Sequence, residues 1–386
     1  MLKNRIKYVD KYLVLPYIAL TLFSVIMVYS ASSYSALNDY GNPHHYLPRQ
    51  AVFVGMSYFF FVVSLFLPLQ ILKQKKVVIF GILLTAVSLF FLLLFGREIY
   101  GAKRWIETPL FNIQPAEFTK FMVIWYLAYI LSKKQKKIAE NFYRAVVAPV
   151  FLVALIVLFI YIQPDTGSAF IIVIISAVMI FASGVSPKLG MGFGLFGVGS
   201  LFGMTQLIRN FGTDLFFLDE YRYNRFLGYW DPFQLAEGAG LQLVNSYYAL
   251  SRGGLLGVGF GDSIQKTGYL PFPYTDFIVS IIGEEFGLLG ISVLFSVFAL
   301  MVSRMFLTGI RSKSAFNSLL SIGIASMFLI QSLINLMGVV GLMPITGVTF
   351  PFISYGGSSL MVLSVSLGLV ANVSARVNYQ RAESQL

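Results

Sequence analysis

A few ionisable residues of this chain lie within or beside long apolar stretches, and these residues are the ones that could perform acid–base chemistry. Only 12% of the 386 residues are charged, about half of the roughly 25% found in soluble domains. Because a charge at membrane depth is costly, each ionisable residue in such a stretch is a candidate for function. The candidates are Glu117, Lys120, Asp165, Asp276, Glu284 and Glu285.

Asp276 has the most defined setting among these candidates. It follows the segment 269–275, in which Pro271 and Pro273 stiffen the chain. The carboxylate is therefore expected in a fixed position at the mouth of the apolar run that starts at residue 276. An aspartate there could simply cap a helix, or it could belong to a functional site at the membrane face.

The other candidates allow both structural and functional interpretations. Glu117 and Lys120 share a helix face, so they form either a compensated pair or part of a site. Asp165 could cap the helix that follows it or belong to the same site. Glu284 and Glu285 point in different directions on a helix, so at least one faces the protein interior, as the partner of a buried cation or as a catalytic group.

The composition disfavours several kinds of site. The chain has no cysteine, and its two histidines, His44 and His45, are adjacent, which favours a polar loop pair over a metal site. The glycine-rich run at 253–261 lacks the Lys-Ser/Thr ending of a phosphate loop. Tight turns or close helix packing are expected there instead, and no metal ligands are predicted.

About ten apolar runs of roughly 20 residues would position these groups as transmembrane helices. The runs are continuous and not alternating, which predicts helices and excludes a β-barrel. The expected fold is an all-α integral membrane protein, a single polytopic domain over residues 1–386. The predicted spans are 12–31, 50–72, 77–96, 115–132, 145–163, 168–184, 189–208, 276–303, 315–342 and 359–375.

Lysine and arginine set the expected orientation, with both termini cytoplasmic. The net charge of +11 is then a topology signal, and no nucleic-acid partner is needed to explain it. The opposite side carries the short connections 32–49, 97–114 and 343–358, and one large loop at about 209–275 between the seventh and eighth spans. The cytoplasmic side holds Lys3, Arg5, Lys7, Lys11, Lys73, Lys75, Lys76, Lys133, Lys134, Lys136, Lys137, Arg144, Lys188, Arg304, Arg311, Lys313, Arg376 and Arg381.

The order of the motifs resembles the SEDS family, the membrane peptidoglycan polymerases RodA and FtsW, over nearly the whole chain. Within the family, the segments 275–277 and 346–359 are more similar to the FtsW branch than to the RodA branch. The motifs that carry the resemblance are Arg104-Trp105-Ile106 and the segments 114–120, 164–167, 240–246, 253–254, 263–266, 269–271, 275–277, 283–287, 344–347 and 351–359.

The resemblance implies a peptidoglycan glycosyltransferase that polymerises lipid II into β-1,4 glycan strands on the outer membrane face, with inversion. The family's essential aspartate maps onto Asp276, which would be the general base. The sequence departs from the family at Phe272 and Tyr274, where Glu and His are usual, so any help from that histidine in proton transfer is missing. The implied substrate-binding residues are Arg104, Glu117, Lys120, Asp165, Gln242, Lys266, Ser354, Gly356 and Gly357.

The resemblance also implies the ligands and partners of the protein. The substrate would be lipid II, an undecaprenyl-diphosphate-linked disaccharide peptide, and no cofactor is required, although a divalent cation could neutralise the diphosphate. The partners would be a class B penicillin-binding transpeptidase and other cell-division membrane proteins, at the septum of the bacterial plasma membrane.

Three alternatives remain beside this interpretation. One is a lipid II flippase, which is disfavoured because no internal repeat is visible and the candidate residues concentrate on one face. The second is the elongation role of the RodA branch. The third is a non-catalytic scaffold for cell division, which would leave the outer Arg and Asp residues without a purpose.

Overall fold

The computed structural model describes residues 6–96, 104–108, 112–185, 187–215 and 218–385, apart from the side chains of residues 136, 139, 187–189, 193, 196, 198 and 201. Over these ranges the chain is helical, with one isolated antiparallel bridge between Ile106 and Ile113. The elements are α2 (Lys11–Tyr40), α3 (Tyr46–Phe66), α4 (Leu69–Leu72), α5 (Lys75–Phe95), α6 (Pro115–Glu140), α7 (Phe142–Ile162), α8 (Thr166–Ala182), α9 (Pro187–Phe211), η1 (Gly212–Asp214), α10 (Glu220–Trp230), α11 (Leu241–Gly253), η2 (Gln265–Tyr269), α12 (Ile278–Arg311), α13 (Ala315–Val339) and α14 (Gly357–Glu383).

The long helices confirm the predicted all-α membrane fold. Each of the predicted spans corresponds to one of them: α2, α3, α5, α6, α7, α8, α9, α12, α13 and α14. Among the described residues, 7 helices are long and apolar enough to cross a membrane, namely α2, α3, α5, α7, α12, α13 and α14. Passage of the other three through a bilayer stays a prediction.

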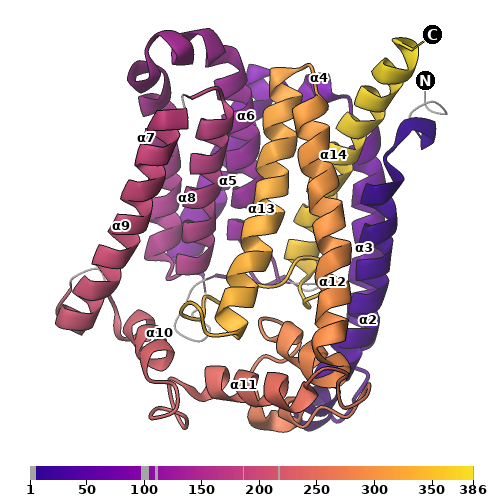
Figure 1. The fold of residues 1–386 in the computed structure, drawn as a ribbon, viewed down its shortest axis with the longest axis vertical. Coiled ribbons are helices and arrows are strands. Elements are labelled where there is room, and N and C mark those ends of the chain that lie inside the picture. Colours follow the sequence, from indigo (N-terminus) through magenta and orange to yellow (C-terminus); the bar gives the residue numbers. More distant parts are fainter. Residues whose placement is uncertain (1–5, 97–103, 109–111, 186, 216–217, 386) are drawn as a thin grey trace.

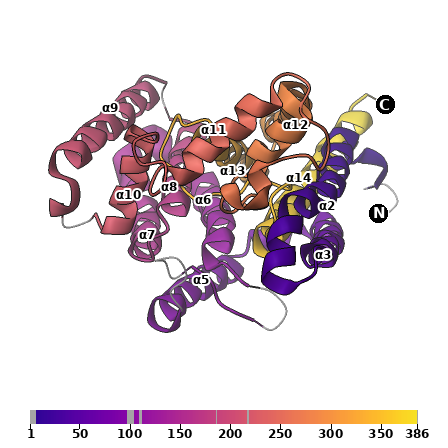
Figure 2. The same cartoon turned by 90° about the horizontal axis from the view of Figure 1, so that it is seen from below.

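The two ends of the helix bundle differ in content. Both termini lie at one end, together with α4 and the connections α6–α7 and α12–α13 (Figure 1). At the opposite end, α10 and α11 lie across the bundle, between α9 on one side and α2 and α3 on the other (Figure 2). Both termini thus lie beside the basic connections, and the assignment of this end to the cytoplasm stays a prediction.

Local chemistry sets the helix ends. α2 begins after Asp10, whose side chain accepts a hydrogen bond from the Tyr12 N–H at 3.0 Å. It ends at Gly41, which has a φ of +67°. Asn141 separates α6 from α7 and caps the latter by accepting from the Arg144 N–H at 3.3 Å. These caps satisfy backbone groups that a helix leaves open at its ends.

Polar side chains join the apolar helices α2, α3 and α14 to one another. The Tyr17 hydroxyl on α2 is hydrogen-bonded at 2.9 Å to both Ser57 on α3 and Ser364 on α14. Asn372 on α14 donates to the backbone carbonyl of Leu67 at 2.7 Å, just beyond α3. Such bonds between helices stabilise packing where lipid supplies no hydrophobic drive.

Candidate functional site

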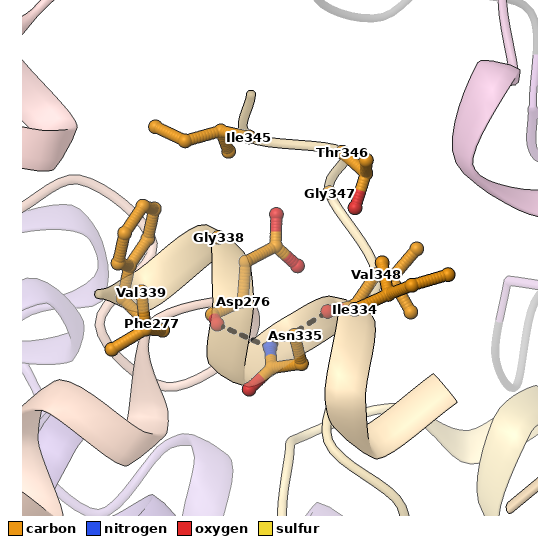
Figure 3. A pocket seen from close by; sticks show the side chains of 10 residues that line it. All are labelled: Asp276, Phe277, Ile334, Asn335, Gly338, Val339, Ile345, Thr346, Gly347 and Val348. Atoms are coloured by element: carbon orange, nitrogen blue, oxygen red, sulfur yellow. Dashed lines mark hydrogen bonds between the residues drawn. The ribbon is translucent and has the colours of Figure 1, made fainter. Parts of the chain in front are cut away.

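Asp276 lies in the turn before α12, and its carboxylate faces the loop at residues 345–348 (Figure 3). The interpretation of Asp276 as a helix cap is wrong, because α12 has Phe277 at its N-cap and no side-chain cap bond. The carboxylate instead borders a small pocket between this turn, α13 and the loop. The pocket is lined by Asp276, Phe277, Ile334, Asn335, Gly338, Val339, Ile345, Thr346, Gly347 and Val348.

Asn335 on α13 holds the two walls of this pocket together. Its side-chain Nδ2 donates to the Asp276 backbone carbonyl at 2.7 Å and to the Val348 carbonyl at 2.8 Å. Figure 3 shows both bonds on the side away from the Asp276 carboxylate. Asn335 therefore fixes the backbone of Asp276 and leaves the carboxylate directed at the pocket.

Two guanidinium groups and the Asp276 carboxylate surround Gly347. A methyl group added at Gly347 would lie 3.4 Å from Arg104 Nη1, 3.5 Å from Asp276 Oδ2 and 3.7 Å from Arg225 Nη1. Gly347 also has a φ of +74°, which favours glycine. The three charged groups therefore gather around one point that the absent side chain of Gly347 leaves open.

Each arginine also donates to a backbone carbonyl, which helps to fix its orientation. The Arg104 guanidinium donates to the backbone carbonyl of Pro164. Arg225 donates from Nη1 to the Ile345 carbonyl at 2.7 Å and from Nη2 to the Tyr221 hydroxyl, and its guanidinium lies over the Tyr221 ring at 4.7 Å. Pre-oriented cations of this kind suit a diphosphate group.

The environment of Asp276 changes its basicity. Burial raises the pKa of the Asp276 carboxyl above its usual value, while the Arg225 and Arg104 guanidiniums oppose this rise and the Asp165 carboxylate adds to it. A raised pKa makes the carboxylate a stronger base than an exposed aspartate, which is what general base catalysis near neutral pH requires.

Asp165 caps a helix and also lies close to the charged groups around Gly347. Its Oδ1 accepts from the Ser168 N–H at 3.1 Å, which confirms it as the N-cap of α8. Its Oδ2 accepts from Gln114 Nε2 at 3.2 Å. Because Asp165 also acts electrostatically on both Asp276 and Arg225, it lies beside the site as well.

The predicted pair of Glu117 and Lys120 is confirmed, with Nζ 2.7 Å from Oε1 and both side chains buried on α6. Lys120 also donates to Gln331 Oε1 on α13 at 3.1 Å, and Gln331 Nε2 donates to the Thr349 carbonyl at 3.1 Å. Across the described residues, Glu117 Oε2 has no hydrogen-bond partner. Through Gln331, the pair is therefore linked to the backbone of the loop 343–356.

Among the other predicted site residues, Ser354 and Gly357 make structural contacts. Ser354 donates to the Thr275 carbonyl at 2.7 Å and so braces the residue before Asp276. Gly356 and Gly357 form the start of α14, where a methyl group on Gly357 would meet the Phe53 ring at 3.0 Å. Gln242 lies half-buried in the first turn of α11.

Lys266 belongs to a second polar cluster. Its Nζ lies 2.6 Å from Glu285 Oε1, and Ser30 donates to the same oxygen at 2.6 Å. Glu284 accepts from Arg252 at 2.8 Å and from Ser263 at 2.5 Å. The predicted burial of both glutamates with cationic partners is confirmed, but the cations come from α11 and η2 and not from a neighbouring membrane-spanning helix.

Sequence reasoning missed four residues of the site. Arg225 belongs to none of the motifs named above, and Gly347 is only one residue of the motif at 344–347. Gln331 and Asn335 are four residues apart in a predicted apolar span, so their common face was a usable signal of polar function. In the part of the chain that the structure describes, no three His, Asp or Glu side chains are grouped to hold a metal ion.

The fold and site define a multi-pass helical membrane protein with an aspartate–arginine site at the end of the bundle opposite the termini. The model of the FtsW/RodA/SpoVE family, described as "Cell cycle protein", matches residues 11–379. The chain belongs to this family.

Named relatives and solved structures agree with this assignment. The chain is 40% identical to a Bacillus subtilis (strain 168) protein named "Probable peptidoglycan glycosyltransferase FtsW", over 98% of this chain and 94% of that protein. It is 33% identical to the Enterococcus hirae protein of the same name, over 97% and 94%.

Two solved structures share the fold over almost the whole length. One, described as "Structural coordination of polymerization and crosslinking by a peptidoglycan synthase complex", matches with a TM-score of 0.76 and 26% identity, over 96% of this chain and 99% of that chain. The other is the Thermus thermophilus rod shape determining protein RodA, with a TM-score of 0.67 and 25% identity, over 96% and 98%.

Proposed function

We propose that this chain is a peptidoglycan glycosyltransferase of the FtsW type, which polymerises lipid II into β-1,4 glycan strands at the outer membrane face during septal wall synthesis. The observation that carries the proposal is the meeting of the Asp276 carboxylate with Arg104 and Arg225 around Gly347. Family membership and the names of the relatives support the same activity.

The mechanism needs one base and a cationic site for the leaving group. Asp276 removes the proton from the 4-hydroxyl of the acceptor sugar, and that oxygen attacks the anomeric carbon of the donor. The new glycosidic bond forms as the bond from the anomeric carbon to the diphosphate oxygen breaks, with inversion. Arg104 and Arg225 stabilise the negative charge on the departing polyprenyl diphosphate. The diphosphate leaves as an anion, so a second carboxylic acid is not required, unlike in glycoside hydrolysis.

The surrounding residues position these three groups. Asn335 and Ser354 hold the backbone at Asp276 and Thr275. We propose that Asp165 and the pair of Glu117 and Lys120 help to orient the substrate and to balance the charge of the arginines. Gln242, Gly356 and Gly357 stay proposed contacts of the substrate along the rest of its path, whereas Lys266, bound to Glu285 at 2.6 Å, is assigned a structural role instead.

The proposed partner is a class B penicillin-binding transpeptidase. A polymerase on the outer face makes strands that another enzyme must crosslink, and one structural neighbour is described as a synthase complex that coordinates polymerization and crosslinking. The site and the outer segment α10–α11 lie at the same end of the bundle, accessible to such a partner (Figure 1). Other cell-division membrane proteins are the expected neighbours at the septum.

The test is lipid II polymerisation by the purified protein with its transpeptidase, with moenomycin added to block classical glycosyltransferases. Asp276→Asn is expected to reduce the rate by roughly 10²–10⁴, the usual contribution of a general base. Asp231→Asn, an exposed carboxylate of the same outer segment, is the matched control and is expected to keep wild-type activity. Glycan strands of normal length and rate from Asp276→Asn would refute the assignment.

A further inference from the structure

α12 is interrupted at Gly287, well inside the helix. Gly287 has a φ of +66° and a ψ of −168°, a region of backbone conformation that essentially only glycine adopts. In a continuous helix, the N–H groups of Leu288 and Leu289 would donate to the carbonyls of Glu284 and Glu285. The break opens both of these bonds.

The glycine-rich loop at residues 253–261 fills the break with its own backbone. Two N–H groups of the loop donate to the open carbonyls, and the two open N–H groups of α12 donate to carbonyls of the loop. The four bonds are Val258 N to Glu284 O at 3.0 Å, Gly259 N to Glu285 O at 3.1 Å, Leu288 N to Gly254 O at 2.9 Å and Leu289 N to Leu255 O at 3.1 Å.

Glycines allow the loop to lie directly on the backbone of α12. A methyl group on Gly253 would lie 1.9 Å from the Gly283 carbonyl oxygen, and one on Gly257 would lie 2.2 Å from the Glu285 carbonyl oxygen. No side chain fits between the two segments at these points. The contact is therefore one of backbone on backbone, with polar groups paired across it.

The break lies at membrane depth. Arg304, near the C-terminal end of α12, is bound to Asp10 through two nitrogens at 2.6 and 2.7 Å, and we take this charged pair as the membrane boundary at that end. At 1.5 Å per residue, Leu288 lies about 24 Å along the axis from Arg304, within a hydrocarbon core of roughly 30 Å. Non-helical backbone is tolerated at this depth only when its polar groups are paired, and the four bonds meet that condition.

The side chains of the loop match lipid. Residues 253–261 contain no charged or hydrogen-bonding side chain. Leu255 and Leu256 at the tip are 69% and 77% exposed, and they continue the apolar surface formed by the exposed Leu288 and Leu289 of α12. Two exposed leucines beside a lipid-facing helix are costly in water and favourable in acyl chains.

We propose that residues 253–261 form a re-entrant loop that enters the bilayer at the site end of the bundle, with Leu255 and Leu256 in contact with lipid acyl chains. The loop anchors the outer segment to the membrane next to α12. The proposal concerns an interaction surface and does not depend on the enzymatic assignment.

Because the chain contains no cysteine, a single introduced cysteine can be spin-labelled specifically. Leu255→Cys and Leu256→Cys are labelled separately, and the protein alone is placed in nanodiscs of phosphatidylglycerol and phosphatidylethanolamine. Collision with oxygen, which concentrates in acyl chains, is compared with collision with a water-soluble nickel chelate. Val293→Cys, an exposed apolar position on α12, is the lipid control, and Glu237→Cys, exposed in the outer segment, is the water control.

Both tip labels are expected to favour oxygen, as the Val293 label does, while the Glu237 label favours the chelate. Chelate preference at both tip positions would place the loop in water and overturn the proposal. Protection from both reagents would indicate a protein contact, either within the chain or with another copy, and would also overturn it. Unchanged thermal unfolding of each labelled protein verifies the fold. The two tip labels are independent, so the proposal requires the same oxygen preference at both.

Discussion

Two groups of buried charges lie on either side of the start of α12, and they differ in how they are held. At Glu284 and Glu285, every cation is in direct contact with a carboxylate, as between Lys266 and Glu285 at 2.6 Å. Around Gly347, the charges of Asp276, Arg104 and Arg225 face one point, and each arginine also donates to a backbone carbonyl.

The difference shows how to separate structural from functional charges in a membrane protein. Intramembrane ionisable residues are all candidates by residue type. A carboxylate that is ion-paired at 2.6–2.8 Å, as Glu284 is with Arg252 and Glu285 is with Lys266, has little capacity for a substrate. A carboxylate next to oriented cations, but not bound to them, can accept a proton and leaves the cations available for an anion. We therefore assign stability to the glutamates and chemistry to Asp276.

The largest effect is expected from breaking the glutamate cluster. Lys266→Met leaves Glu285 buried without its cation, which should cost about 3–5 kcal/mol of folding stability. Thermal unfolding in detergent measures it, with Asp276→Asn as the contrast that should keep its stability. The double variant Lys266→Met/Glu285→Leu should recover part of the loss. A Lys266→Met protein as stable as the wild type would mean that the cluster is not structural.

Gly347→Ala should affect activity more than stability. The added methyl group would stand among the three charged groups, at 3.4–3.7 Å from each, and a left-handed backbone costs a non-glycine residue about 1–2 kcal/mol. Polymerisation is expected to fall by more than tenfold. Gly338→Ala in the same pocket lining, where a methyl group would have only a contact at 4.0 Å, is the control and should stay active.

Asn335→Ala should reduce turnover about tenfold, because Asp276 and the loop at Val348 lose their shared donor and two buried carbonyls lose a hydrogen bond each, at about 1 kcal/mol apiece. As a positioning residue, Asn335 should lower kcat with little change in the KM for lipid II. The reverse pattern, a raised KM with unchanged kcat, would contradict this role and place Asn335 in substrate binding.

The smallest expected effect is a change in pH dependence. Since burial raises the Asp276 pKa and Arg225 opposes that rise, Arg225→Met should raise the pKa further. A base works only when deprotonated, so the activity of Arg225→Met, relative to its own plateau, should be lost at a higher pH on the acid side than in the wild type. Arg222→Met is the control, because Arg222 lies one turn away on α10 and is paired with Asp219. This variant should lose activity on the acid side at the same pH as the wild type.

The sequence by itself determined the helices and their order. Apolar runs of membrane length have few alternatives in lipid, so the predicted spans matched the long helices. Short-range patterns were also sufficient for the pair of Glu117 and Lys120 and for the cap at Asp165, because both lie within one helical turn of their partners. Motif order was sufficient for the family.

Tertiary structure alone decided which charges meet. Arg225, Gly347 and Asp276 are far apart in the chain, and only the packing of α10 and the loop 343–356 against the start of α12 brings them to one point. The same packing placed Lys266 on Glu285, although its residue type suited either cluster. The sequence specifies which side chains are present. The distances between remote segments depend on which helix faces pack together, and uniformly apolar runs specify those faces only weakly.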